Sequence, residues 1–184
     1  MTATGLAILA ATAAKGINRD LRADIPDEIV DLIYAFAGGA VAASFIPVPG
    51  LDVAVATADV WVMYTQINRK LGISFSKNLM KSIGSAVIAN LTANLGQIGI
   101  SLALKLIPGV GTAVGGTLMA VTVFGTTVAA GWVYLKALCK FYESKKKSGD
   151  GSEKALKDAV DDVLKNDKDG IRDAYKDGKD KYKK

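Results

Sequence analysis

The stretch that decides the fold is residues 106–135, LIPGVGTAVGGTLMAVTVFGTTVAAGWVYL. It contains 30 residues without a formal charge, and a second uncharged run of 23 residues, 82–104, precedes it with only Lys105 between the two. A helix needs about 20 apolar residues to cross a bilayer. The helix expected from Gly111 to Leu135 has no charge on any side, whereas a helix that packs on one side keeps a polar face. The pattern therefore favours membrane insertion over a soluble core.

Charge is concentrated at the opposite end of the chain. The 184 residues are 50% apolar and 22% charged, with a formal net charge of +5. Residues 143–184 hold 13 of the 23 basic and 11 of the 18 acidic residues. Because cations and anions alternate there and no aromatic-rich basic face is evident, the sequence argues against nucleic acid as a partner.

The composition also excludes many kinds of enzyme. The chain has no His and one Cys, so it offers no Ser-His-Asp triad, no His base, no His-containing zinc site and no internal disulfide. Cys139 is interpreted as a small buried apolar residue, as in a protein of a reducing compartment. The glycines between 109 and 117 lack the Lys of a phosphate-binding loop. We expect a non-enzymatic protein without catalytic, cofactor-binding or metal-binding residues.

Proline and glycine divide the apolar part into helices. An N-cap candidate, an early Pro and two acids predict a helix start at residues 24–28. The breaks at 46–50 and 107–111 then predict two helical hairpins, 24–72 and 76–142, which resemble a weak internal repeat. The predicted fold is all-α, with two membrane-associated hydrophobic hairpins and a charged amphipathic helical tail. The hairpin turns are assigned to Pro47, Pro49, Gly50, Pro108, Gly109 and Gly111.

The two ends of the chain differ from the hairpins. Residues 1–23 form an Ala-rich segment without the basic start of a secretory signal, which either lies on a membrane surface or packs as an ordinary helix. Residues 143–152 are expected to be a linker. The tail, 153–184, repeats apolar residues at spacings of three and four and predicts one or two short helices. Because its other face mixes both charge signs, we expect it to dock on protein rather than lipid.

A polar seam runs along one face of the first arm of the second hairpin. Its members are spaced by three or four residues: Asn90, Asn94, Gln97, Ser101 and Lys105. Unpaired amides in lipid cost several kcal/mol, so the seam needs partners. One interpretation is hydrogen bonding to Thr122, Thr126 or Thr127 of the returning arm. The other is a polar lumen formed by several copies of the chain.

Cations flank the apolar hairpin, and the stretch from Arg69 to Lys140 contains no acid. Contacts with anionic lipid headgroups are assigned to Arg69, Lys70, Lys77, Lys81, Lys136 and Lys140. If the hairpin spans a membrane, the positive-inside rule places both of its ends and the C-terminal tail in the cytoplasm. Asp52 fits a helix N-terminus, whereas Asp59 interrupts an apolar helix and has no evident role.

The order of these motifs resembles a hydrophobic, GTPase-associated family of unknown function. The similarity covers about residues 28–143, and its most specific part is Pro108-Gly109-Val110-Gly111-Thr112 between two apolar helices. That family occurs in bacterial inner-membrane proteins and as a C-terminal domain of dynamin-like or Era-like GTPases. The resemblance implies a helical membrane module that works beside a GTPase. Since this chain has no GTPase domain, such an enzyme would act in trans. The family brings no established catalytic residues.

Three functional hypotheses follow. The first is a self-associating membrane anchor, scaffold or membrane-shaping subunit whose tail recruits a GTPase or another soluble protein. The second is an oligomeric, toxin-like pore, which the polar seam suggests. The third is a soluble Ala-rich bundle that binds an apolar ligand.

Overall fold

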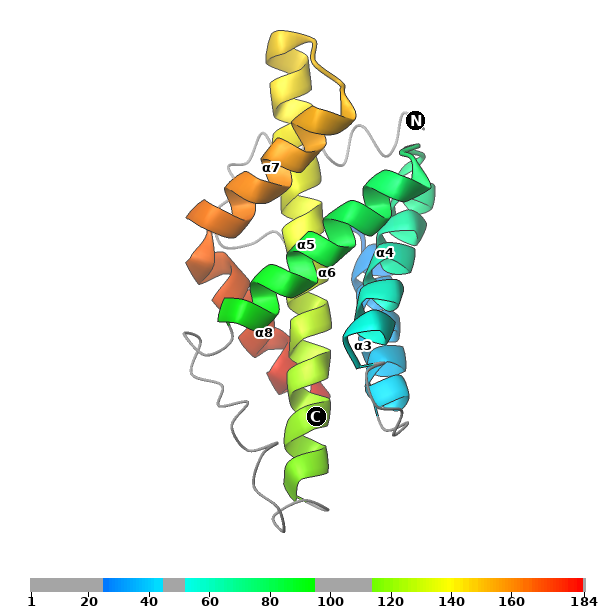
Figure 1. Ribbon diagram of the computed structural model, residues 1–184, viewed down its shortest axis with the longest axis vertical. Coiled ribbons are helices and arrows are strands. Elements are labelled where there is room, and N and C mark those ends of the chain that lie inside the picture. The colour runs from blue at the N-terminus through cyan, green and yellow to red at the C-terminus, as the bar shows by residue number, and fades with distance from the viewer. Residues whose placement is uncertain (1–24, 45–51, 95–113, 184) are drawn as a thin grey trace.

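The computed structural model describes residues 25–44, 52–94 and 114–183 (Figure 1). These residues form helices and no strand, which confirms the all-α prediction for the described part of the chain. The helices are α3 (Asp27–Ser44), α4 (Asp52–Leu71), α5 (Lys77–Asn94), α6 (Val114–Ser148), α7 (Glu153–Asn166) and α8 (Lys168–Tyr182). The N-terminal segment 1–23 and all six predicted turn residues, Pro47, Pro49, Gly50, Pro108, Gly109 and Gly111, lie outside the described residues.

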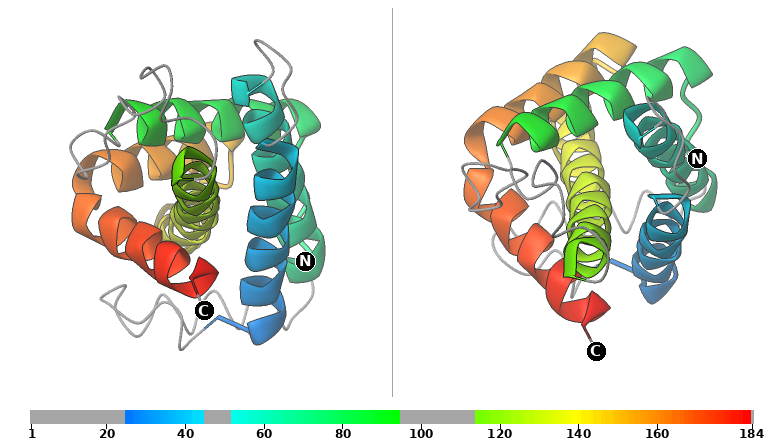
Figure 2. Two further views of the ribbon diagram at one scale, coloured as in Figure 1. Left: turned by 90° about the horizontal axis from the view of Figure 1, so that it is seen from below. Right: turned by 60° about the horizontal axis from the view of Figure 1, so that its bottom comes forward.

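The 35-residue helix α6 lies at the centre of the molecule. Figure 2 shows it nearly end-on, with α3 and α4 on one side, α7 and α8 on the other and α5 across a third side. The apolar surface of α6 is therefore covered by protein. Most side chains from Ala120 to Phe141 are buried.

Ala120–Ser148 is long and apolar enough to cross a membrane, and within the described residues it is the one segment that meets these criteria. In this structure 78% of its most apolar window is buried inside the protein. A helix that is apolar all round suits the core of a protein as well as a bilayer. Burial by the surrounding helices thus accounts for its missing polar face without requiring lipid.

The pair α3 and α4 forms where the first hairpin was predicted. The helix α4 ends at Leu71 because Gly72 adopts a φ of 65°, a left-handed conformation that favours glycine. Both helices pack on α6. The ring of Tyr64 stacks on Tyr134 with 4.0 Å between centroids, and its hydroxyl donates to the Ala130 carbonyl at 3.0 Å.

A buried polar cluster joins α4, α5 and α6. The Tyr134 hydroxyl donates to Oδ1 of Asn68 at 2.8 Å, and Nδ2 of Asn68 donates to Sδ of Met80 at 3.2 Å. Asn68 is 4% exposed, and these bonds satisfy its amide. Burial raises the pKa of both Tyr64 and Tyr134, so the two hydroxyls remain hydrogen-bond donors at physiological pH.

The arms of the predicted second hairpin cross instead of lying side by side. Figure 1 shows α5 running obliquely over α6, and α5 packs mainly along α4. Gly84 permits this approach, because a Cβ there would lie 3.2 Å from Cβ of Trp61. Small residues of α5 and α6 therefore bring different helix pairs together, rather than the two arms of one hairpin.

The linker is shorter than predicted. Residues 143–148 were assigned to it, but α6 continues through Lys145, Lys146 and Lys147 to Ser148. Lysines at a helix C-terminus interact favourably with the helix dipole, which explains the extension. Gly149 ends the helix with a φ of 75°, and Ser152 caps α7 by accepting the Ala155 N–H at 3.1 Å.

The charged tail docks on its own domain, whereas the sequence predicted docking on protein without identifying the surface. The apolar stripes of α7 and α8 pack on α6. Their buried residues are Leu156, Val160, Val163, Leu164, Ile171, Ala174 and Tyr175. The contact is close at two glycines. A Cβ on Gly125 would lie 2.9 Å from the carbonyl oxygen of Tyr175, and one on Gly178 would lie 2.9 Å from Cβ of Val128.

Gly125→Ala should destabilise the protein by about 1–3 kcal/mol, because the added methyl group forces α8 away from α6. The matched control is Gly38→Ala on α3, where nothing lies within 4 Å of the new Cβ. That change should stabilise the helix by about 0.5–1 kcal/mol. Urea unfolding measures both free energies. Equal effects of the two substitutions would contradict the packing of α8 on α6.

Candidate functional site

Two of the cations assigned to lipid headgroups face the protein itself. Lys136 of α6 forms an ion pair with Asp167, and Lys140 forms one with Asp162 of α7. Lys136 is only 7% exposed. The headgroup assignment is therefore wrong for Lys136 in this structure, because the docked tail supplies a carboxylate. Lys140 is partly exposed, and its hydrogen bond lowers the pKa of Asp162, with Asn166 adding to the shift.

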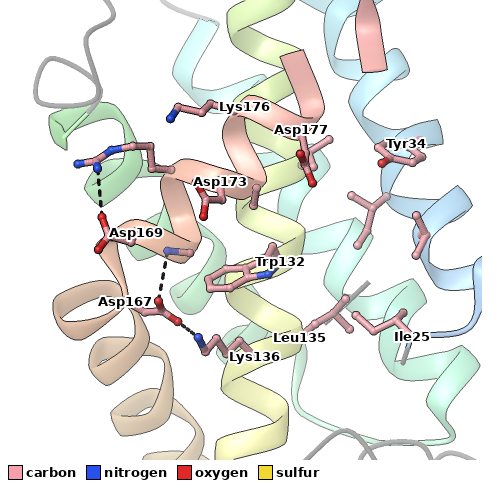
Figure 3. A pocket seen from close by; sticks show the side chains of 16 residues that line it. Ile25, Tyr34, Trp132, Leu135, Lys136, Asp167, Asp169, Asp173, Lys176 and Asp177 are labelled. Atoms are coloured by element: carbon pink, nitrogen blue, oxygen red, sulfur yellow. Dashed lines mark hydrogen bonds and ion pairs between the residues drawn. The ribbon is translucent and has the colours of Figure 1, made fainter. Parts of the chain in front are cut away.

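Asp167 holds the corner between α7 and α8 against α6. Its backbone N–H donates to the Val163 carbonyl at 3.0 Å, which closes α7. Its Oδ1 accepts the Gly170 N–H at 3.3 Å, which caps α8, while its Oδ2 faces Lys136 (Figure 3). The side chain therefore caps a helix and neutralises a buried cation at once.

The other four predicted headgroup residues are exposed and lie around the turn from α4 to α5. We call Arg69, Lys70, Lys77 and Lys81 the cationic corner. The ammonium groups of Lys77 and Lys81 lie 5.2 and 5.4 Å from the ring centroid of Trp61. Cation–π attraction of this kind is worth about 0.5–1 kcal/mol at exposed sites. It keeps two cations and a partly exposed indole on one face.

Few acids neutralise the cationic corner among the contacts that the structure records. Lys70 pairs with the exposed Glu28 at 3.3 Å. Glu153 Oε1 accepts the backbone N–H of Ser76 at 3.3 Å and so lies nearby without pairing with these lysines. The corner therefore keeps a local excess of positive charge. Such a surface suits polyanions, including anionic lipid headgroups.

The described part of the polar seam is satisfied within one helix. Nδ2 of Asn94 donates to both the carbonyl and Oδ1 of Asn90 at 2.9 Å. Gln97, Ser101 and Lys105 lie outside the described residues. The hydroxyls of Thr126 and Thr127 donate to carbonyls one turn back in α6, at 2.8 and 3.0 Å. These bonds differ from the interhelical bonds that the sequence suggested for the two threonines.

The remaining reactive groups offer little chemistry. Burial raises the pKa of the Cys139 thiol to about 12, chiefly by desolvation, so the thiol is protonated at neutral pH. Burial also raises the pKa of Asp59, which is half-buried on α4. Within the described residues no group of three or more His, Cys, Asp or Glu side chains is placed to hold a metal.

Sequence reasoning missed a groove between α3 and α8. Its volume is about 580 Å³, and its floor is formed by α6, including Trp132 and Leu135 (Figure 3). No motif indicates it, because its walls come from residues more than a hundred positions apart.

Comparison with known proteins gives one informative similarity. "Magnetosome membrane protein 22" of Magnetospirillum gryphiswaldense is 34% identical over 125 residues, which cover 65% of this chain and 59% of that protein. The chain thus spans less than two thirds of the curated relative it matches. No family model matches, and no solved structure gives a significant match. The comparisons do not support the resemblance to a GTPase-associated family.

Asp167→Asn should destabilise the protein by about 2–4 kcal/mol, because it retains a cap but leaves Lys136 buried without a counter-ion. The control is Asp162→Asn, which removes the same charge from the more exposed pair with Lys140 and should cost under about 1 kcal/mol.

Adding Lys136→Met to Asp167→Asn should recover most of the loss, because no unpaired buried charge then remains. A double-mutant cycle by chemical denaturation measures the coupling. Additive losses at the two positions would show that the pair does not act as a unit.

Proposed function

We propose that this chain is a membrane-associated, non-enzymatic helical protein that serves as an anchor or scaffold on the cytoplasmic face of a bacterial inner membrane. The observation that carries the proposal is the cationic corner. It combines four exposed cations with the indole of Trp61, and the recorded contacts give one of these cations an acidic partner. The similarity to a protein named as a magnetosome membrane protein supports the choice of a membrane as the polyanion.

The positive charges of the cationic corner provide enough binding free energy to hold the protein on an anionic bilayer. A Lys or Arg near an anionic bilayer contributes about 1 kcal/mol. Four cations give about 4 kcal/mol, and a partly exposed indole suits the interface between headgroups and acyl chains. Binding should therefore require anionic lipid and weaken with salt. A neutral bilayer should bind the protein weakly.

In this proposal α6 stays in the protein core while the cationic corner meets the headgroups. Insertion of α6 would first require α7 and α8 to leave it, which separates the Lys136–Asp167 pair and exposes the apolar stripe of the tail. Peripheral attachment needs no such rearrangement. Self-association, recruitment of a partner through the tail, and orientation of the termini toward the cytoplasm remain predictions from the sequence.

The pore and the GTPase partner gain no support from the structure or the comparisons. Asn90 and Asn94 are the described members of the seam, and they bond to each other along α5. The other members lie outside the described residues.

The test is flotation of the full chain with vesicles of neutral phosphatidylcholine, with and without anionic phosphatidylglycerol. Lys77→Gln with Lys81→Gln should weaken binding to the anionic vesicles about 30-fold, as two lost contributions of about 1 kcal/mol predict. The matched control is Lys154→Gln with Lys157→Gln, which removes two exposed lysines from α7, where Asp158 already pairs with Lys154.

The control variant should bind nearly as well as the parent protein. Equal weakening by both double variants would show a general charge effect instead of a defined face. Failure of the parent protein to float with anionic vesicles would refute the proposed attachment.

A further inference from the structure

The C-terminal end of α6 projects beyond the other helices and carries three consecutive lysines. Lys145, Lys146 and Lys147 are all exposed, and Figure 1 shows this end of α6, in yellow, at the top of the molecule. We call these residues the lysine triplet. The ion pairs of the described residues give none of the three an acidic partner. Their ammonium groups are therefore available to an anionic partner in solution or on a surface.

The lysine triplet lies at the same end of the protein as the cationic corner. Phe75, in the turn that leads into Lys77, packs edge-on against Phe141 of α6 with 5.7 Å between ring centroids. The backbone N–H of Ser76 in the same turn donates to Glu153, which follows the triplet after a short loop. A helix rises 1.5 Å per residue, so the triplet begins about 6 Å along α6 from Phe141. The two groups of cations thus flank one aromatic contact.

The acids that follow the triplet bond to backbone groups instead of lysines. Oδ1 of Asp150 accepts the Ser152 N–H at 2.9 Å, and Oε1 of Glu153 accepts that of Ser76 at 3.3 Å. These carboxylates reduce the local positive charge without holding the lysine side chains in place. The lysines keep the freedom to reach a partner.

Partly exposed apolar groups at this end favour a bilayer over a dissolved polyanion. Ile73 and Phe75 of the turn and Tyr142 of α6 are only partly buried. The ammonium group of Lys145 lies 5.9 Å from the ring centroid of Tyr142, an arrangement like that of the lysines over Trp61. Aromatic rings beside cations suit the interface between headgroups and acyl chains. A dissolved polyanion such as polyphosphate offers these rings no apolar layer.

We propose that the lysine triplet and Tyr142 form a second headgroup-binding site, which together with the cationic corner holds this end of the protein on an anionic bilayer. The inference rests on the proposed function and adds a contact from a different helix. Two contacts on separate helices fix the orientation of the protein as well as its attachment. The C-terminal end of α6 then faces the membrane, and the uncharged part of α6 stays covered by protein.

Flotation with phosphatidylglycerol-containing vesicles tests the second site. Changing all three residues of the triplet to Gln should weaken binding at least about tenfold, because three cations near the anionic surface are lost. The matched control combines Lys165→Gln, Lys168→Gln and Lys176→Gln, which removes the same charge from exposed positions further along the tail. Since these positions lie away from the proposed contact, the control should bind within about threefold of the parent protein.

A fluorescent label reports the position of the triplet directly. In a Cys139→Ala background, Lys146→Cys carries a nitrobenzoxadiazole label whose emission should shift to shorter wavelength on the anionic vesicles. The same label at Lys176→Cys should show no shift. Circular dichroism and the unfolding midpoint verify that each variant is folded.

The outcomes separate this inference from the proposed function. If the parent protein floats and the Lys77–Lys81 double variant binds weakly, but the triplet variant binds like the parent, the second site is refuted and the cationic corner stands. A lower unfolding midpoint with unchanged binding would restrict the lysines to stabilising the end of α6. Loss of polyphosphate binding in the triplet variant, without a shift of the label on vesicles, would assign the triplet to a soluble polyanion. Either of these results also overturns the inference.

Discussion

The helix α6 carries no formal charge from Val114 to Leu135, and all five other described helices pack against it. Apolar surface on every side of a helix must be removed from water, and one neighbouring helix cannot cover it. In this protein two kinds of helix cover α6. The uncharged faces of α3 and α4 cover one side, whereas the amphipathic helices α7 and α8 cover another and present their charges to solvent.

Local signals predicted much of this fold. Gly72 ends α4 where the first hairpin was predicted to end, and the apolar repeats of the tail fall on its buried stripe. Such signals depend on residues within one turn of each other. What they could not show is which surface covers α6, because hydrophobicity is the same property whether the neighbour is lipid or Leu156. The tail contains the apolar stripe that covers part of α6, but sequence periodicity does not show which distant segments pack together.

In the candidate site, too, features formed by residues close in sequence could be predicted, whereas features formed by distant residues could not. The cationic corner could be predicted because its members are close in sequence and no acid interrupts them. Lys136 was misassigned because its counter-ion, Asp167, lies 31 residues further along the chain and reaches it only after α7 and α8 fold back. The groove was not predictable at all, since α3, α6 and α8 meet there only in the folded chain.

The position of Asp167 has a consequence for how the tail behaves as a unit. One carboxylate begins α8 through the Gly170 N–H and also binds Lys136 on α6. If the tail leaves α6, Lys136 loses its counter-ion. If the first turn of α8 unfolds, the Asp167 carboxylate is free to move away from Lys136. Secondary structure at this corner and tertiary docking are therefore coupled. The tail should leave α6 in a cooperative step in which the first turn of α8 loosens together with the contact.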